Sequence, residues 1–272
     1  MRSTRFRFQD LNRILPWIGV GLIVISLNMW TTPRSEPDLQ KPIENPVLAG
    51  WFDTVVIDPG HGGSDEGASA HGLKEKDLTL DLGQKLAVEL QKQGLKTLLT
   101  RSEDLYVALT DRVTFANAIP HAIFLSLHCN FSSDTNAKGL EVYRCVAKSA
   151  GSQSLVTVAN ADEPDQPLEQ VEEELARSLD DAFVQLLHAD NRGQKRENFF
   201  VVRNVFYPAV LIECGFLTNA EEARRLGSAS YRQQLAQSLA TGIVSYRTLV
   251  GGNGTKTVSN ASNSNVIVVT QR

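Results

Sequence analysis

The chain has 272 residues, enough for one well-buried domain of roughly 200 residues and two terminal extensions. Its net charge is −4 and no basic stripe lies beyond the N-terminus, so we expect no nucleic-acid partner, because a phosphate backbone requires clustered cations. Three cysteines are too few and too scattered for a disulfide framework.

The first 30 residues have the pattern of a membrane-targeting segment. Four arginines precede an apolar run at residues 14–30 that only Pro16, Ser26 and Asn28 interrupt. The run is close to the lower length limit for a bilayer span, about 17 to 25 residues, and no clear cleavage site follows it. We therefore predict an uncleaved anchor at residues 1–30, with a cleaved signal peptide as the alternative. The positive-inside rule places the rest of the chain in the cell envelope, on the periplasmic or extracytoplasmic side of the inner membrane.

Two further segments have the composition of flexible chain. Residues 31–50 contain four prolines and many charges, which is typical of a linker. The stretch at residues 251–272 begins with a run rich in glycine, asparagine and serine, which predicts a disordered tail. The folded domain is therefore predicted at residues 51–250.

Short apolar runs alternate with helical patterns across this domain. The alternation predicts an α/β fold, a single domain with a twisted, mostly parallel or mixed sheet of about six strands and helices on both faces. One predicted helix follows His61 and has leucines at a spacing of four from Leu78 to Leu90; two others are predicted at residues 168–187 and 231–249. Strands are predicted at residues 55–57, 96–100, 122–128, 140–146, 199–202 and 209–213.

Residues that can bind metal or transfer protons follow several of these strands. His61 lies in a glycine-rich loop after the first strand, His128 ends the third and Glu213 ends the sixth, while Glu75 begins the leucine-striped helix. Ligands bind at the carboxyl edge of such sheets, so we expect these side chains to gather there. Two histidines, one carboxylate and a spare carboxylate are the parts of a catalytic zinc site. Alone, Glu75 would be read as a complement to the helix dipole.

Other polar residues leave alternatives open. Period-2 alternation turns Cys129 and Cys214 away from the predicted site, so we expect buried thiols, and a Cys–His nucleophilic pair is the weaker interpretation. His71 lies in a loop near Glu75 and could replace it as a ligand, although a solvated loop residue is the simpler interpretation. No role is assigned to His121 or His188.

Five blocks of sequence carry a more specific signal than any single motif. They are VVIDPGHGG, LKEKDLTLDLGQKLAVEL, TRSEDLYVALTDRVTFAN, FLSLHCN and NRGQKRENFFVVRNVFYPAVLIECGFLTN. In this order they resemble the zinc-dependent N-acetylmuramoyl-L-alanine amidases of the Amidase_3 type, and the resemblance covers Asp53 to about Leu249. The resemblance implies that His61, Glu75 and His128 hold one zinc ion, that Glu213 is the catalytic carboxylate, and that the fold is a twisted sheet between helices.

The resemblance also implies an activity. The implied reaction is hydrolysis, by a zinc-activated water, of the amide bond between N-acetylmuramic acid and L-alanine of the stem peptide in peptidoglycan. One alternative is a non-catalytic peptidoglycan-binding or regulatory module that keeps the fold. Such a module would be expected to lose a zinc ligand or the catalytic carboxylate, but all four positions are filled here. A second alternative is another zinc peptidase acting on muropeptides, but the His-x-x-Glu and His-Glu-x-x-His patterns are absent.

The link at residues 147–167 is longer than the minimal one of the family. Some members of the family carry an inserted helix in this region that blocks the site until an activator binds. Here the segment is short and polar, which predicts at most a mobile loop. The expected partners are therefore the peptidoglycan substrate, the membrane through the N-terminal segment, and an activator protein as a hypothesis.

Overall fold

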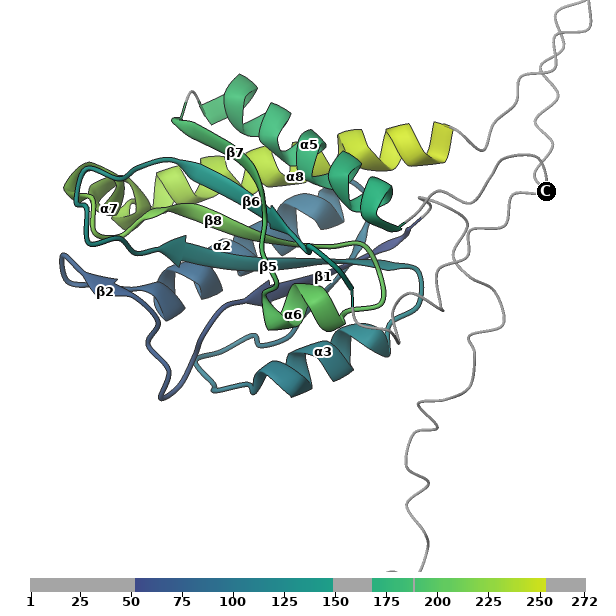
Figure 1. The fold of residues 1–272 in the computed structure, drawn as a ribbon, viewed down its shortest axis with the longest axis horizontal. Helices are drawn as coiled ribbons and strands as arrows, with labels where there is room; N and C mark the ends of the chain where they lie inside the picture. Colours follow the sequence, from purple (N-terminus) through teal and green to yellow (C-terminus); the bar gives the residue numbers. More distant parts are fainter. Residues whose placement is uncertain (1–51, 149–167, 188, 253–272) are drawn as a thin grey trace, which may run out of the picture. The chain divides into compact units, whose positions relative to one another are not determined.

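The computed structural model describes residues 52–148, 168–187 and 189–252 (Figure 1). The predicted anchor, the linker, nearly all of the 147–167 link and the tail from residue 253 lie outside these residues. Within the described part of the chain, no helix combines the length and the apolar character needed to cross a membrane.

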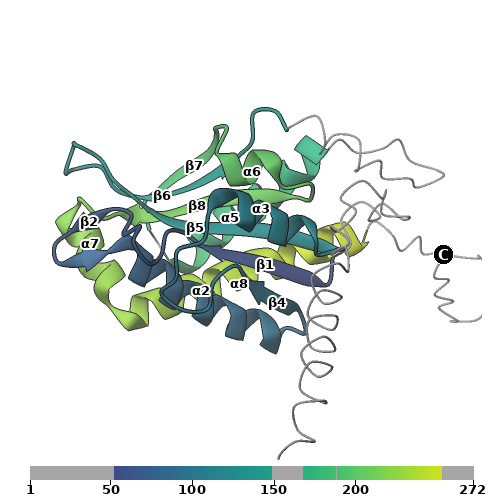
Figure 2. The same cartoon turned by 90° about the horizontal axis from the view of Figure 1, so that it is seen from below.

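A six-stranded mixed sheet forms the centre of the domain, in the order β4-β1-β5-β8-β6-β7 (Figure 2). Strands β4, β1, β5 and β8 run parallel to one another, whereas β6 is antiparallel to β8 and parallel to β7. The sheet confirms the predicted α/β class. Its strands are β1 (Thr54–Pro59), β4 (Lys96–Leu99), β5 (Ala122–Asn130), β6 (Leu140–Arg144), β7 (Asn191–Arg196) and β8 (Ala209–Phe216).

Helices cover both faces of this sheet. On one face, α2 (Glu75–Lys92), α5 (Leu168–Leu187) and α8 (Ala229–Gly252) enclose the larger hydrophobic core, which includes the leucine stripe of α2. On the other face, α3 (Leu109–Asn117) and α6 (Phe200–Asn204) lie together, below the strands in Figure 1. All six residues of β1 are buried because the strand is covered on both faces, which explains its continuously apolar run. A short helix, α7 (Ala220–Gly227), packs against α8, and β2 (Ser69–Ala70) pairs with β3 (Leu73–Lys74).

One predicted strand is wrong. Residues 200–202 belong to the helical turn α6, which Phe199 precedes and which buries Val201 and Val202, and the sixth strand of the sheet is β7 instead. The sequence of β7, NRGQKR, is wholly polar because β7 is the edge strand, where no alternation of buried side chains is required and charged residues prevent edge-to-edge pairing. A short apolar run such as FFVV cannot be assigned to a strand or a helix by periodicity alone. Helices α3 and α7 were also not predicted.

Candidate metal centre

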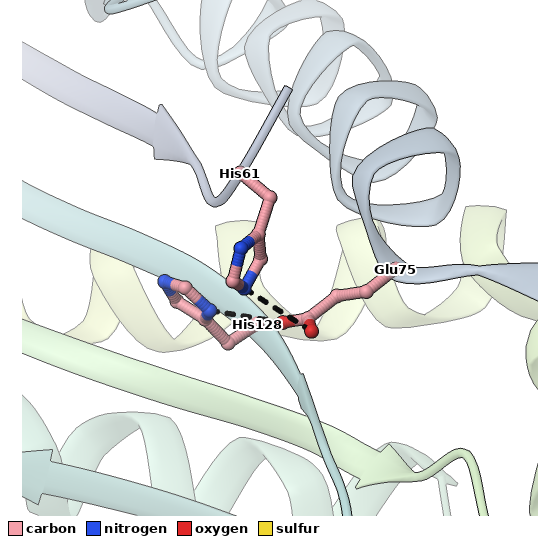
Figure 3. A group of neighbouring side chains, drawn as sticks. All are labelled: His61, Glu75 and His128. Carbon is pink, nitrogen blue, oxygen red and sulfur yellow. Dashed lines mark hydrogen bonds and ion pairs between the residues drawn. The ribbon is translucent and has the colours of Figure 1, made fainter. Parts of the chain in front are cut away.

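Three predicted residues meet at the carboxyl edge of the parallel strands. His61 follows β1, His128 lies near the end of β5, and Glu75 is the first residue of α2. Each offers one ligand atom, and these atoms all lie within 4.8 Å of one another (Figure 3). The ends of β1 and β5 and the start of α2 thus bring these side chains together, as the sequence predicts.

The Glu75 carboxylate joins the two imidazoles. Its Oε2 atom lies 3.1 Å from His61 Nε2, and its Oε1 atom lies 2.9 Å from His128 Nδ1. The two rings face each other edge to face, with centroids 4.9 Å apart. Two imidazole nitrogens and a carboxylate oxygen therefore converge on one point, which is the donor set that Zn²⁺ accepts in catalytic sites.

Asp65 orients the first of these imidazoles. Its Oδ2 atom lies 2.9 Å from His61 Nδ1, and its Oδ1 atom accepts a hydrogen bond from the backbone N–H of Gly67. Zinc-binding histidines commonly donate their second ring N–H to a carboxylate, which fixes the tautomer. Asp65 was not singled out from the sequence, although a carboxylate four residues after the loop histidine is a signal that could have found it.

Glu75 stays ionised although it is buried. Burial would raise the pKa of its carboxyl group, but the hydrogen bonds and charges of His128 and His61 hold that pKa well below its usual range. Two backbone N–H groups, those of Ala68 and Cys129, also donate to it, at 2.7 and 2.9 Å. Burial lowers the pKa of His61, but the carboxylates of Glu75 and Asp65 together raise this pKa by more than burial lowers it, so the net shift is upward.

A buried ion pair holds the loop that carries His61. The backbone of His61 has φ of +62°, in the left-handed region that disfavours residues with a Cβ. Arg112 donates from Nη2 to the His61 carbonyl at 2.7 Å and from Nη1 to Asp58 Oδ1 at 2.6 Å. Thr100 and Ser126 donate to the same Asp58 carboxylate. The α3 arginine therefore supports the backbone conformation that turns the imidazole toward Glu75.

Two glycines, Gly60 and Gly67, allow the backbone of the loops around the cluster to pack directly against its side chains. A Cβ on Gly60 would lie 2.4 Å from His128 Cε1. A Cβ on Gly67 would lie 2.5 Å from Glu75 Oε2 and 2.6 Å from His61 Cδ2. Such distances are far below van der Waals contact, so only glycine fits at either position while the rings keep their places.

Glu213 lies beside the cluster, on the neighbouring strand. It is paired with His128 in the register of β8 and β5, which places both side chains on one face of the sheet. Its Oε2 atom is buried and has no hydrogen-bond partner among the described residues. Burial, reinforced by the charges of Glu75 and Glu141, raises the pKa of Glu213 to about 7. A carboxyl group with a pKa near neutrality can accept and return a proton at physiological pH.

A pocket opens next to His61 and His128. Besides the two histidines, its lining includes the polar residues Asp58, Asp65 and Arg112. A concave site that combines a few polar groups with apolar side chains is typical of ligand binding. The other side chains of the lining belong to Tyr106, Val107, Leu109 and Val201.

The remaining candidates do not contribute side chains to the cluster. Cys129 and Cys214 are buried in the larger core, and burial raises the pKa of both thiols, so the structure confirms the prediction of buried thiols. His71 is exposed, with Nε2 3.4 Å from the Thr218 carbonyl. His121 precedes β5, at the end opposite His128, and His188 lies outside the described residues.

Known proteins are similar to this chain over most of the described fold. Residues 55–245 match the family model described as N-acetylmuramoyl-L-alanine amidase. The chain is 32% identical over 234 residues to N-acetylmuramoyl-L-alanine amidase LytC of Bacillus subtilis, a match that covers 84% of this chain and 43% of LytC. It is 32% identical over 225 residues to N-acetylmuramoyl-L-alanine amidase AmiA of Escherichia coli, covering 73% of this chain and 77% of AmiA. The crystal structure of N-acetylmuramoyl-L-alanine amidase from Clostridium difficile 630 is 33% identical with a TM-score of 0.61, covering 72% of this chain and 97% of that one.

Proposed function

The chain belongs to the N-acetylmuramoyl-L-alanine amidase family, and on that premise we propose that it hydrolyses the amide bond between N-acetylmuramic acid and L-alanine of the stem peptide in peptidoglycan. In this proposal His61, Glu75 and His128 hold one zinc ion, and Glu213 is the catalytic base. The chain spans less than half the length of LytC, so the proposal concerns the domain that the two proteins share.

The convergence of His61, Glu75 and His128 carries the proposal. Their ligand atoms lie within 4.8 Å of one another, and the carboxylate of Asp65 fixes the tautomer of His61. Three protein ligands leave an open position, as catalytic zinc sites do. When bound there, zinc supplies an acidified water and a positive charge that polarises the substrate carbonyl.

Glu213 supplies the proton transfers. Its buried Oε2 atom has no hydrogen-bond partner among the described residues, and it lies on the face of the sheet that carries His128. The carboxylate takes the proton of the attacking water and returns it to the L-alanine nitrogen as the amide bond breaks. A pKa raised to about 7 suits a group that must act as a base and then as an acid.

The deciding experiment is digestion of purified peptidoglycan by the full chain and by its Glu213→Gln variant. We expect the wild-type protein to release new L-alanine N-termini, and we expect a chelator to stop that release. The variant should bind one zinc ion per chain and lose activity by about 10² to 10⁴-fold, the usual contribution of a general base. Glu221→Gln, which changes an exposed carboxylate at the start of α7, is the matched control and should keep full activity.

The same digestion separates the alternatives. Full activity in the Glu213→Gln variant would refute the role of Glu213. A wild-type protein that binds zinc and peptidoglycan but releases no N-termini would be a binding or regulatory module. New N-termini on residues other than L-alanine would identify a muropeptide peptidase instead.

The setting of this activity belongs to the proposal as well. The arginines and the apolar run at residues 14–30 support an anchor in the inner membrane, with the domain acting on the periplasmic or extracytoplasmic side. A peptidoglycan substrate fits that side of the membrane. An activator that acts through residues 147–167 stays a hypothesis, and proteolytic trimming of that link without a gain in activity would contradict it.

A further inference from the structure

A second buried carboxylate, Glu141, lies on the site face of the sheet and collects positive charge. Its side chain is 1% exposed, and its Oε1 atom accepts hydrogen bonds from both Arg192 and Lys195 of β7. Its Oε2 atom accepts one from Tyr143 at 2.6 Å and one from Asn130 at 2.9 Å. These four hydrogen bonds satisfy both oxygens of the Glu141 carboxylate within the protein itself.

The Glu141 carboxylate does not neutralise both Arg192 and Lys195. Two positive charges share a single negative charge, which leaves the group with a net charge of +1. The side chains of Arg192 and Lys195 are 41% and 35% exposed, so a ligand can reach them. Arg192 contacts Glu141 through Nε, whereas its Nη1 and Nη2 atoms have no hydrogen-bond partner among the described residues. Those two atoms form the fork that pairs with a carboxylate.

Ring contacts fix the direction of both cations. The guanidinium carbon of Arg192 lies 5.2 Å from the centroid of the Phe216 ring, and Lys195 Nζ lies 5.7 Å from that of Tyr143. Cation–π contacts of this kind, together with the shared hydrogen bonds to Glu141, reduce the side-chain entropy that a bound ligand would otherwise remove.

The charged group stands next to the proposed reaction centre. Glu141 is paired with Glu213 in the register of β6 and β8, and Glu213 is paired with His128 in that of β8 and β5. Neighbouring strands lie about 4.8 Å apart, so Glu141 lies roughly 5 Å from Glu213 and roughly 10 Å from His128, and β7, whose two cations reach back to Glu141, lies one strand further out. Two extended residues counted from the scissile nitrogen span about 7 Å, which brings a carboxylate on the residue after L-alanine into the range of this group.

We propose that Arg192 and Lys195, held by Glu141, form a subsite for a carboxylate on the stem-peptide residue that follows L-alanine. This inference rests on the proposed function and adds to it a specificity for the charge of the peptide. A purely structural role, in which the cations only neutralise Glu141, would give no such specificity.

The test uses two probes that differ by one charge, N-acetylmuramoyl-L-alanyl-D-alanine and its C-terminal amide. Their dissociation constants are measured by calorimetry on the zinc-loaded Glu213→Gln full chain, and their kcat/KM values on the active protein. We expect the free carboxylate to bind about tenfold to a hundredfold more tightly than the amide, in line with a charge-assisted hydrogen bond.

Arg192→Gln should make the affinities for the two probes nearly equal, because it weakens binding of the carboxylate probe alone. Lys195→Gln is the second variant and should reduce the preference in the same direction. Arg196→Gln, on the same strand, is the matched control, because Arg196 pairs with Glu169, and it should keep the preference. Equal affinities in the parent protein, or a similar loss for both probes in Arg192→Gln, would overturn the subsite. Binding with the expected preference but no cleavage by the active protein would instead refute the proposed hydrolysis and leave the subsite standing.

Discussion

Two glutamates in this site have pKa values shifted in opposite directions because their surroundings differ. Glu75 receives two imidazoles and two backbone N–H groups, and its pKa lies well below the usual range. Glu213 is half-buried, but its buried Oε2 atom has no hydrogen-bond partner among the described residues, and its pKa is raised to about 7. These opposite shifts suit the proposed roles of Glu75 as a ligand and Glu213 as a group that exchanges a proton, the pattern that separates roles in catalytic sites.

This difference predicts how stability depends on pH. In zinc-free protein, the pKa of Glu213 is about 7 when folded and near the usual 4.5 when unfolded. The folded state therefore holds more protons between these values, so the free energy of unfolding falls as the pH rises from about 4.5 to about 7. The contribution is fully present below pH 4.5, is lost above pH 7, and is on the order of 3 kcal/mol.

Urea unfolding of wild-type protein and of Glu213→Gln, with chelator present, checks this dependence. Glutamine does not titrate, so the stability of the wild-type protein relative to the variant should decrease across that range. A difference that stays constant from pH 4 to pH 8 would contradict the raised pKa of Glu213.

At the scale of elements, the close approach of the loop after β1 to β5 decides the geometry of the site. Gly60 has no room for a methyl group, because a Cβ would lie 2.4 Å from Cε1 of His128. We predict that Gly60→Ala displaces the imidazole and lowers zinc affinity at least tenfold, since misplaced ligands cost metal binding. Zinc affinity measured by competition with a chromogenic chelator checks this.

Gly227→Ala is the control for this substitution. Its Cβ would lie 3.5 Å from the nearest side-chain atom, an ordinary contact. Neither position has a positive φ, so the two variants differ in steric space and not in backbone strain. Equal zinc affinities for Gly60→Ala and the parent protein would show that the loop can move away from His128.

The elements also show what the sequence could predict. The buried strands β1, β5 and β8 were predictable because residues covered on both faces must be apolar, and the polar residues at or just beyond the ends of these apolar runs pointed to the site. The edge strand β7 was not predictable, because an edge strand buries few side chains and its polar sequence is typical of a loop. The contact of Arg112 with the His61 carbonyl was out of reach as well, since it joins residues 51 positions apart and depends on where α3 packs.

Across the whole molecule, metal binding should be visible as folding stability. The three proposed ligands come from the loop after β1, from α2 and from β5, which an unfolded chain does not hold together, so zinc should bind the folded state preferentially. We predict that free zinc at 100 times its dissociation constant adds about 2.7 kcal/mol to the free energy of unfolding. Denaturation in chelator and in buffered zinc measures the increment.

Two histidine variants make that prediction specific. His128→Ala should abolish the increment, because it removes one of the three ligands. His71→Gln should retain it, because His71 is exposed and lies outside the cluster. An increment that survives in His128→Ala would place the zinc elsewhere on the chain.

The position of β8 has a consequence for synthesis and export. β8 is the last strand in the sequence, yet it lies inside the sheet, between β5 and β6. A nascent chain that has emerged only as far as residue 208 contains all three proposed ligand residues, but it lacks the strand that joins the two halves of the sheet and the carboxylate on it. Under the proposed function and setting, the chain cannot become a hydrolase before its last strand has emerged, and an incompletely translocated polypeptide would be inert toward peptidoglycan.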